Sequence, residues 1–134
     1  MKPNTAPGNA TVLFVEDNLA MLSLARLALE SAGHKVLLAS DGREALDHYR
    51  RNRERIDVVV ADLVLPDMSG VELIQEIRAI DSSVLIIVAT GLSRTEARAA
   101  LQAGADRMVI KPYTVACLLG EVDRSTPMAA GMGA

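Results

Sequence analysis

The chain has little of what disulfide-stabilised and membrane proteins need. It contains a single cysteine among 134 residues, which excludes an internal disulfide framework. It has no uninterrupted apolar run of about 20 residues, the length that a membrane-spanning helix requires. A charged-then-apolar signal segment is also missing from its start. We therefore expect a cytoplasmic protein without a membrane segment.

The chain also lacks an excess of positive charge. The formal net charge is -3 at pH 7, and only three residues are lysines. Because contacts with nucleic-acid phosphates require a basic surface, we expect no direct binding of nucleic acid by this chain. Half of the residues are hydrophobic and 23% are charged, which is the composition of a globular domain, and the length suits one such domain.

The two ends of the chain differ in composition from the rest. Residues 1–10 and 125–134 are rich in Pro, Gly, Asn, Ser and Ala and have few side chains that could pack against a core. We predict flexible tails there and a single domain over residues 11–124. Cys117 lies in an apolar stretch of this domain, so we expect a small core residue at that position.

Within the domain, short apolar runs alternate five times with amphipathic stretches. The predicted strands are residues 12–15, 35–39, 56–61, 84–89 and 108–110. This alternation predicts parallel strands joined by helices, with right-handed crossovers that place helices on both faces of the sheet. The fold class is therefore α/β, a doubly wound five-stranded parallel sheet of order 2-1-3-4-5 with five helices. Gly33 and Gly104 are predicted to end two of the helices.

Acidic side chains and one lysine stand at the ends of three predicted strands. Glu16 and Asp17 follow the first strand, Asp62 follows the third and Lys111 follows the fifth. Ligands of such sheets bind beyond the carboxyl ends of the strands, so these charges are expected to meet at one edge. Three carboxylates would repel one another without a cation, and oxygen ligands suit Mg²⁺. We predict Mg²⁺ as a weakly held cofactor.

This arrangement favours phosphoryl chemistry. An aspartate beside Mg²⁺ can attack a phosphoryl donor and form an acyl phosphate. Thr90 ends the fourth predicted strand, so its hydroxyl and the Lys111 ammonium would share the charge of a transferred phosphoryl group. No glycine-rich turn follows the first strand, which disfavours a nucleotide cofactor.

The ordered set of these residues resembles the receiver domain of bacterial two-component response regulators, the CheY-like domains. The resemblance covers residues 11–124. It is carried by the acidic turn 16–18, the loop 62–70, Thr90, the turn 104–106 and the Lys111-Pro112-Tyr113 segment. It implies a phosphoacceptor domain of a phosphorelay, in which Asp62 accepts the phosphoryl group from a histidine kinase or a histidine phosphotransfer protein.

The resemblance also implies a set of metal ligands. Glu16, Asp17 and Asp62 would hold Mg²⁺ together with the backbone carbonyl of Leu63 or Val64. These assignments place the predicted cofactor directly at the predicted phosphoacceptor.

Further roles follow from the same resemblance. Thr90 would move towards the phosphoryl oxygens and Lys111 would pair with the phosphate. Pro66 and Gly70 would shape the loop after the phosphoacceptor. The bond between Lys111 and Pro112 is expected to be cis, since X-Pro bonds adopt that form at modest cost.

Three positions depart from the family pattern. Switching in the family couples the threonine to an aromatic ring three residues before the lysine, and this chain has Met108 there. Positions two beyond the aspartate and two beyond the threonine influence hydrolysis in the family; here they are Val64 and Leu92. Neither side chain can orient a water by hydrogen bonding, so we predict a long-lived phosphoryl state.

Signalling through phosphorylation-dependent protein contacts is the leading interpretation, either as a stand-alone response regulator or as a receiver segment of a hybrid kinase. A homodimer is possible in either case. One alternative is a Mg²⁺-dependent phosphatase of the haloacid dehalogenase type, but such enzymes carry the nucleophile on their first strand in an Asp-x-Asp motif, whereas Asp62 follows the third. Another alternative is a degenerate receiver that binds partners without phosphorylation. We expect no enzymatic activity beyond assistance to the domain's own phosphorylation and dephosphorylation.

Overall fold

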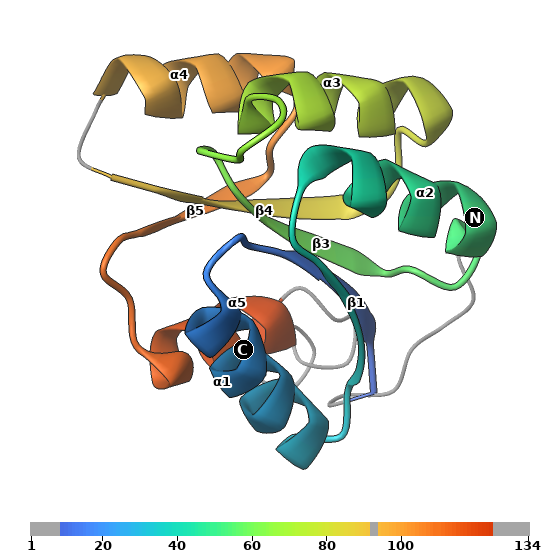
Figure 1. Ribbon diagram of the computed structural model, residues 1–134, viewed down its shortest axis with the longest axis vertical. Coiled ribbons are helices and arrows are strands. Elements are labelled where there is room, and N and C mark those ends of the chain that lie inside the picture. The colour runs from blue at the N-terminus through green and yellow to red at the C-terminus, as the bar shows by residue number, and fades with distance from the viewer. Residues whose placement is uncertain (1–8, 92–93, 125–134) are drawn as a thin grey trace.

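The computed structural model describes residues 9–91 and 94–124, in which five strands alternate with five helices (Figure 1). The strands are β1 (Thr11–Val15), β2 (Lys35–Ala39), β3 (Val58–Asp62), β4 (Leu85–Thr90) and β5 (Arg107–Ile110). The helices are α1 (Leu19–Ser31), α2 (Gly42–Asn52), α3 (Gly70–Ile80), α4 (Arg94–Ala103) and α5 (Val115–Arg124). No helix in the described part of the chain has both the length and the apolar character needed to cross a bilayer.

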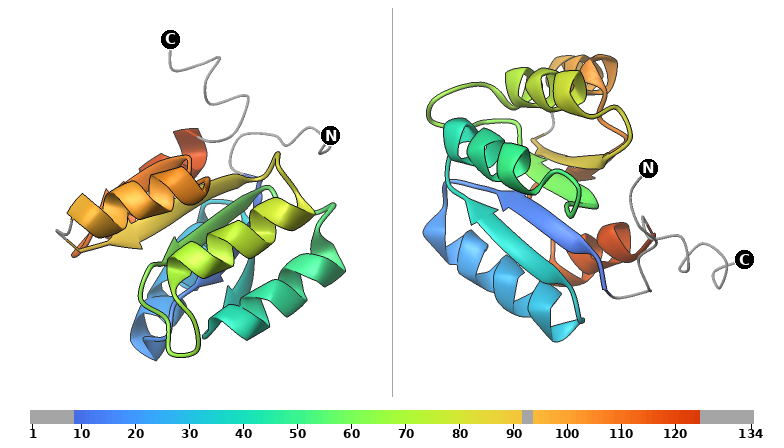
Figure 2. Two further views of the ribbon diagram at one scale, coloured as in Figure 1. Left: turned by 90° about the horizontal axis from the view of Figure 1, so that it is seen from above. Right: turned by 90° about the vertical axis from the view of Figure 1, so that its right-hand side faces the viewer.

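The strands form one parallel sheet in the order β2-β1-β3-β4-β5, which confirms the predicted fold class. Helices α2, α3 and α4 cover one face of the sheet, and α1 and α5 cover the other (Figures 1 and 2). Helix α3 packs between α2 and α4, while α1 packs beside α5. The topology switches between β1 and β3, where the fold class places its ligand site.

The core has two parts, one on each side of the sheet. Leu13 and Val15 pack on the side of α2, α3 and α4, whereas Val12 and Phe14 pack on the side of α1 and α5. This division follows from the strand geometry, because successive side chains point to opposite faces. β3 is buried along its whole length, as expected for a central strand covered on both faces.

Several element boundaries differ from the predicted ones. β3 begins two residues later than predicted, because the Ile56 amide donates to the Asn52 carbonyl at 3.1 Å and so belongs to the turn that follows α2. The strand also includes Asp62, which pairs with Ala89 of β4. β4 lies one residue further along than predicted, and β5 begins one residue earlier.

Two glycines end helices where predicted. Gly33 and Gly104 have φ values of 98° and 122°, a region that favours glycine. The Gly104 amide donates to the Ala100 carbonyl at 3.2 Å, which closes the last turn of α4. Both positions therefore act as helix stops, as the pattern indicated.

Two sequence-based expectations need correction. Cys117 is exposed rather than a core residue, because Leu118 and Val122 form the buried face of α5. Ala10, assigned to the predicted N-terminal tail, is buried, and its amide donates to His34 at 3.0 Å. Asn9, also assigned to the tail, is exposed. The rest of the two predicted tails, residues 1–8 and 125–134, lies outside the described residues.

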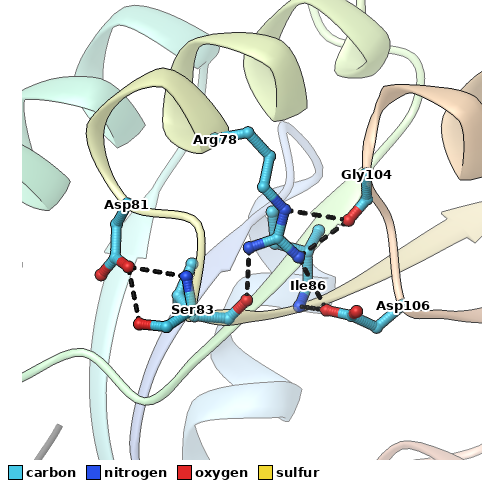
Figure 3. A network of polar contacts seen from close by, with 7 residues as sticks. Arg78, Asp81, Ser83, Ile86, Gly104 and Asp106 are labelled. Atoms are coloured by element: carbon cyan, nitrogen blue, oxygen red, sulfur yellow. Dashed lines mark hydrogen bonds and ion pairs between the residues drawn. The ribbon is translucent and has the colours of Figure 1, made fainter. Parts of the chain in front are cut away.

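Arg78 connects three elements on the α3 and α4 side (Figure 3). Its guanidinium donates to the Val84 carbonyl at 2.6 Å and to the Gly104 carbonyl at 2.8 and 3.0 Å. It also pairs with Asp106 at 2.8 Å, whose carboxylate accepts the Ile86 amide at 2.9 Å. The guanidinium therefore holds α3, the start of β4 and the turn before β5 together.

Candidate functional site

The predicted acids meet at the carboxyl edge of the sheet. Glu16 follows β1, Asp62 ends β3, and both side chains are buried, at 4% and 5% exposure. Asp17 is exposed beside them. One carboxylate oxygen from each of the three lies within 4.8 Å of the others. The parallel pairing of β1 with β3 thus produces the cluster that the sequence predicted.

Lys111 supplies the positive charge of this cluster. Its ammonium pairs with the Asp62 carboxylate and lies 3.6 Å from Glu16 Oε1. Its backbone amide donates to the Thr90 carbonyl at 2.8 Å, which fixes the end of β5 against β4. Burial by itself lowers the pKa of the Lys111 ammonium, but Asp62 and Glu16 together raise it above its usual value. The ammonium therefore remains charged at neutral pH.

Glu16 has the least favourable environment for a negative charge in the described cluster, as its raised pKa shows. Burial raises its pKa, and the nearby charge of Asp62 raises it further. The Asn18 amide, which donates to Glu16 Oε2 at 3.1 Å, and the Lys111 charge act in the opposite direction without cancelling the rise. A divalent cation would remove this repulsion, so the electrostatics of the cluster fit a metal site.

Thr90 adds a second observation that points to a ligand. Its hydroxyl oxygen is buried, and no group in residues 9–91 and 94–124 forms a hydrogen bond with it. Buried hydroxyls nearly always have a partner, and each exception requires an explanation. A phosphoryl oxygen held at Asp62, the end of the neighbouring strand, would explain this one.

The β3–α3 loop, residues 63–69, is closed at its base. The Gly70 amide donates to the Leu63 carbonyl at 2.8 Å, and Val64 pairs with Ser69 in an antiparallel bridge. A Cβ atom on Gly70 would lie 2.5 Å from Leu63 Cα and 2.7 Å from the Asp62 carbonyl oxygen, so the loop needs glycine there. Because the Leu63 carbonyl is already engaged, Val64 is the better candidate for a carbonyl ligand. The Val64 amide itself donates to Asp62 Oδ1 at 3.0 Å.

A cavity of about 700 Å³ opens over the cluster. Its floor is acidic, and one wall is formed by Ala20, Met21 and Leu24 of α1. This wall was not predicted, because an apolar residue on a helix gives no local sign in the sequence of which cavity it faces. Tyr113 also lines the cavity, and burial together with the charges of Glu16 and Asp62 raises its pKa. The sequence signal for Tyr113 at this site was its position directly after the Lys111-Pro112 pair.

The remaining predicted residues have mixed outcomes. The Lys111–Pro112 bond is cis, which confirms that expectation. Met108 is half-buried, pairs in register with Val88, and packs against the core on the side of α2, α3 and α4. It does not line the cavity. Leu92 lies outside the described residues.

The comparisons with known proteins place the chain in one family. Residues 12–123 match the family described as the response regulator receiver domain. The chain therefore belongs to this family, a class of signalling domains of two-component systems.

Particular relatives agree with this assignment. The chain is 36% identical over 106 residues to the probable transcriptional regulatory protein TcrX of Mycobacterium tuberculosis, covering 78% of this chain and 44% of that protein. It is 34% identical over 120 residues to the transcriptional regulatory protein PrrA of the same organism, covering 89% and 51%. The chain thus spans about half the length of the curated relatives it matches.

Solved structures show the same fold. A response regulator receiver domain protein from Clostridium thermocellum superposes with a TM-score of 0.83 at 29% identity, covering 92% of this chain and 98% of that one. A CheY-like receiver domain protein from Methanospirillum hungatei gives a TM-score of 0.82 at 27% identity, with the same coverage.

Proposed function

We propose that Asp62 is the phosphoacceptor of this receiver domain and takes its phosphoryl group from the phosphohistidine of a histidine kinase or histidine phosphotransfer protein. The observation that carries the proposal is the position of the Asp62 carboxylate. It is buried at the floor of the cavity, paired with Lys111 and adjacent to two further carboxylates.

The chemistry follows from this arrangement. An Asp62 oxygen attacks phosphorus, the bond from phosphorus to the donor's imidazole nitrogen breaks, and the imidazole leaves with the bonding electron pair. Lys111 neutralises charge on the phosphoryl oxygens, and the unpartnered Thr90 hydroxyl donates to one of them. These groups position and stabilise the reacting atoms without forming bonds of their own.

Metal binding is the second part of the proposal. The carboxylates of Glu16, Asp17 and Asp62 and the carbonyl of Val64 would hold Mg²⁺, since all four offer hard oxygen ligands. When bound, the ion neutralises negative charge on the phosphoryl group. In its absence Lys111 is the positive charge that the structure places against Asp62.

The output is proposed to be a change in protein contacts. The relatives that continue beyond a comparable domain are named as transcriptional regulators. We propose that the domain itself contacts proteins rather than nucleic acid, because its net charge is -3. A stand-alone form and a segment of a larger protein both fit this role.

Intact mass measurement tests the proposal. The wild-type protein, Asp62→Asn and the control Asp47→Asn, which alters an exposed residue of α2, are incubated with Mg²⁺ and a small acyl-phosphate donor. Wild type and Asp47→Asn should each gain one phosphoryl group, and Asp62→Asn should gain none. Equal labelling of all three would show that Asp62 is not the acceptor.

The same samples separate the alternatives. Labelling of neither wild type nor control would favour a degenerate receiver. Steady release of phosphate from unrelated phosphate esters would instead favour a phosphatase.

A further inference from the structure

Asp67 fastens the β3–α3 loop to the N-terminus of α2. Its Oδ1 accepts the Gly42 amide at 2.8 Å and its Oδ2 accepts the Arg43 amide at 2.9 Å. The first amides of a helix have no partner within the helix, so a carboxylate there is favourable. The hydrogen bonds from Gly42 and Arg43 hold the pKa of Asp67 below its usual value, which keeps the carboxylate charged at neutral pH.

The adjacent residue completes this contact. Met68 lies so close to Gly42 that a Cβ atom there would be 2.4 Å from Met68 Cγ and 2.6 Å from Sδ. Two consecutive residues of the loop tip therefore touch the same turn of α2. Since a methionine side chain is flexible, the two hydrogen bonds of Asp67 supply the directional part of the contact.

Asp67 and Met68, the loop tip that contacts α2, belong to the same loop as Val64. The base of this loop is closed by the Gly70 amide on the Leu63 carbonyl, and Asp62 accepts the Val64 amide. Hydrogen bonds therefore hold this loop both at its base, beside Val64, and at its tip. Loss of the tip contact would allow the direction of the Val64 carbonyl to vary, because that direction depends on the backbone angles of residues 64 and 65.

We infer that Asp67 is a positioning residue for cation binding at the phosphoacceptor site, acting through the β3–α3 loop and the Val64 carbonyl. This inference rests on the proposed function, because it takes Glu16, Asp17 and Asp62 as the other ligands. Asp67 itself does not line the cavity, and its carboxylate accepts hydrogen bonds from amides of α2.

Asp41 provides a matched comparison. It is the N-cap of α2, and its Oδ1 accepts the Glu44 amide at 2.7 Å. Asp41 and Asp67 thus bind amides of the same helix turn, but only Asp67 belongs to the β3–α3 loop. A role limited to capping α2 predicts similar consequences for Asp41→Ala and Asp67→Ala. A role in positioning the loop predicts a difference in cation affinity.

Isothermal titration calorimetry of the purified proteins with MgCl₂ measures this difference in Mg²⁺ affinity. Asp67→Ala should weaken Mg²⁺ binding by about 10-fold, in the range found when groups that orient metal ligands are removed. Asp41→Ala should change it by less than about twofold. Asp67→Asn keeps one oxygen acceptor and should fall between wild type and Asp67→Ala. Acyl-phosphate labelling of Asp67→Ala should recover at saturating Mg²⁺, since its acceptor group is intact.

The outcomes distinguish a failure of the role inferred for Asp67 from a failure of the proposed function. Wild-type binding of Mg²⁺ together with unchanged binding by Asp67→Ala, or with equal losses in Asp67→Ala and Asp41→Ala, would overturn this inference and leave the proposed function standing. A wild-type protein that binds no Mg²⁺ and gains no phosphoryl group would overturn the proposed function and this inference with it. If Asp67→Ala does not fold, Asp67→Asn decides by the same criteria.

Discussion

His34 joins the start of β1 to the end of α5 through the two nitrogens of one buried ring. Nε2 lies 2.9 Å from Asp123 Oδ1, across 89 positions of sequence, and Nδ1 accepts the Ala10 amide at 3.0 Å. Because Nδ1 accepts a hydrogen bond, the neutral ring carries its proton on Nε2, and this N–H donates a hydrogen bond to Asp123. Both polar atoms of a fully buried side chain are thereby satisfied.

Replacement of His34 should lower stability. His34→Leu fills a similar volume but leaves the Ala10 amide buried without a partner, so we expect the free energy of unfolding to fall by about 1–3 kcal/mol. Urea denaturation followed by circular dichroism measures the loss. His48→Leu, at a half-buried position on α2, serves as control and should change stability by less than about 0.5 kcal/mol. Equal losses in the two variants would contradict a specific role for the ring.

Gly70 should tolerate no side chain. Gly70→Ala would place Cβ against backbone atoms of Leu63 and Asp62, which cannot move without disturbing β3. We expect a loss of about 1–3 kcal/mol, typical of overpacking, measured by urea denaturation. Gly120→Ala is the matched control, because nothing lies within 4 Å of its Cβ position in α5. That variant should gain about 0.5–1 kcal/mol from better helix propensity. A stable Gly70→Ala protein would refute the close approach.

Glu16 should make the cation-free protein less stable as pH rises. Its pKa is raised in the folded protein by burial and by Asp62. Between the ordinary value of 4.5 and the raised one, the folded state binds more protons than the unfolded state, so stability falls as pH increases through this window. Glu16→Gln removes the titrating group. With a chelator present, the variant should melt at a higher temperature than wild type at neutral pH.

Added Mg²⁺ supplies the control for that prediction. A ligand that binds only the folded state raises its stability, and the variant has lost one proposed ligand. Mg²⁺ should therefore raise the melting temperature of wild type more than that of Glu16→Gln. A variant that melts below wild type at neutral pH in chelator would contradict the predicted sign.

Arg78 should contribute more than an ordinary surface arginine. Arg78→Ala leaves the Val84 and Gly104 carbonyls without their guanidinium donor and removes the ion pair with Asp106. We expect a loss of about 2–3 kcal/mol, since hydrogen bonds to charged groups are among the stronger ones. The Ile86 amide should also exchange faster with deuterium. Arg26→Ala, which removes only an exposed pair with Glu30 on α1, should cost less than about 0.5 kcal/mol.

Val64 should control the lifetime of the phosphoryl group. Its side chain is 68% exposed and lines the cavity, where an attacking water would approach Asp62. Val64→Asn introduces a group that can orient this water, and we expect the half-life of the acyl phosphate to shorten by roughly 10-fold or more. Mass spectrometry after removal of the donor measures the decay. Val64→Leu, which adds no polar atom, should leave it nearly unchanged; equal acceleration by both would implicate access rather than orientation.

Much of the fold was predictable because its pattern is local. Apolar runs of strand length separated by amphipathic stretches predicted all five strands of the sheet, and parallel strands necessarily end at a common edge. Glu16, Asp62 and Lys111 could therefore be placed together without any knowledge of their distances. The Lys111–Pro112 geometry came from the family resemblance and is confirmed.

What could not be predicted depends on contacts between distant segments. Nothing near His34 in the sequence indicates Asp123 as its partner, and nothing near Asp67 indicates the start of α2. Cys117 was misplaced for a related reason: composition shows that α5 is apolar but does not fix which residues of it meet the sheet. The rotation of a helix about its axis depends on packing against elements elsewhere in the chain.

The contacts of His34 also indicate where a label or a surface can be attached to the protein without blocking the cavity. Ala10 and Asp123 both contact His34 at the amino-terminal edge of the sheet, whereas Asp62 and Lys111 lie at the opposite edge. A fluorescent label, an affinity surface or a fused protein attached just before Ala10 or just after Asp123 would therefore point away from the cavity. Binding measurements on immobilised protein should use these attachment points, because a partner in solution then has open access to the acidic edge.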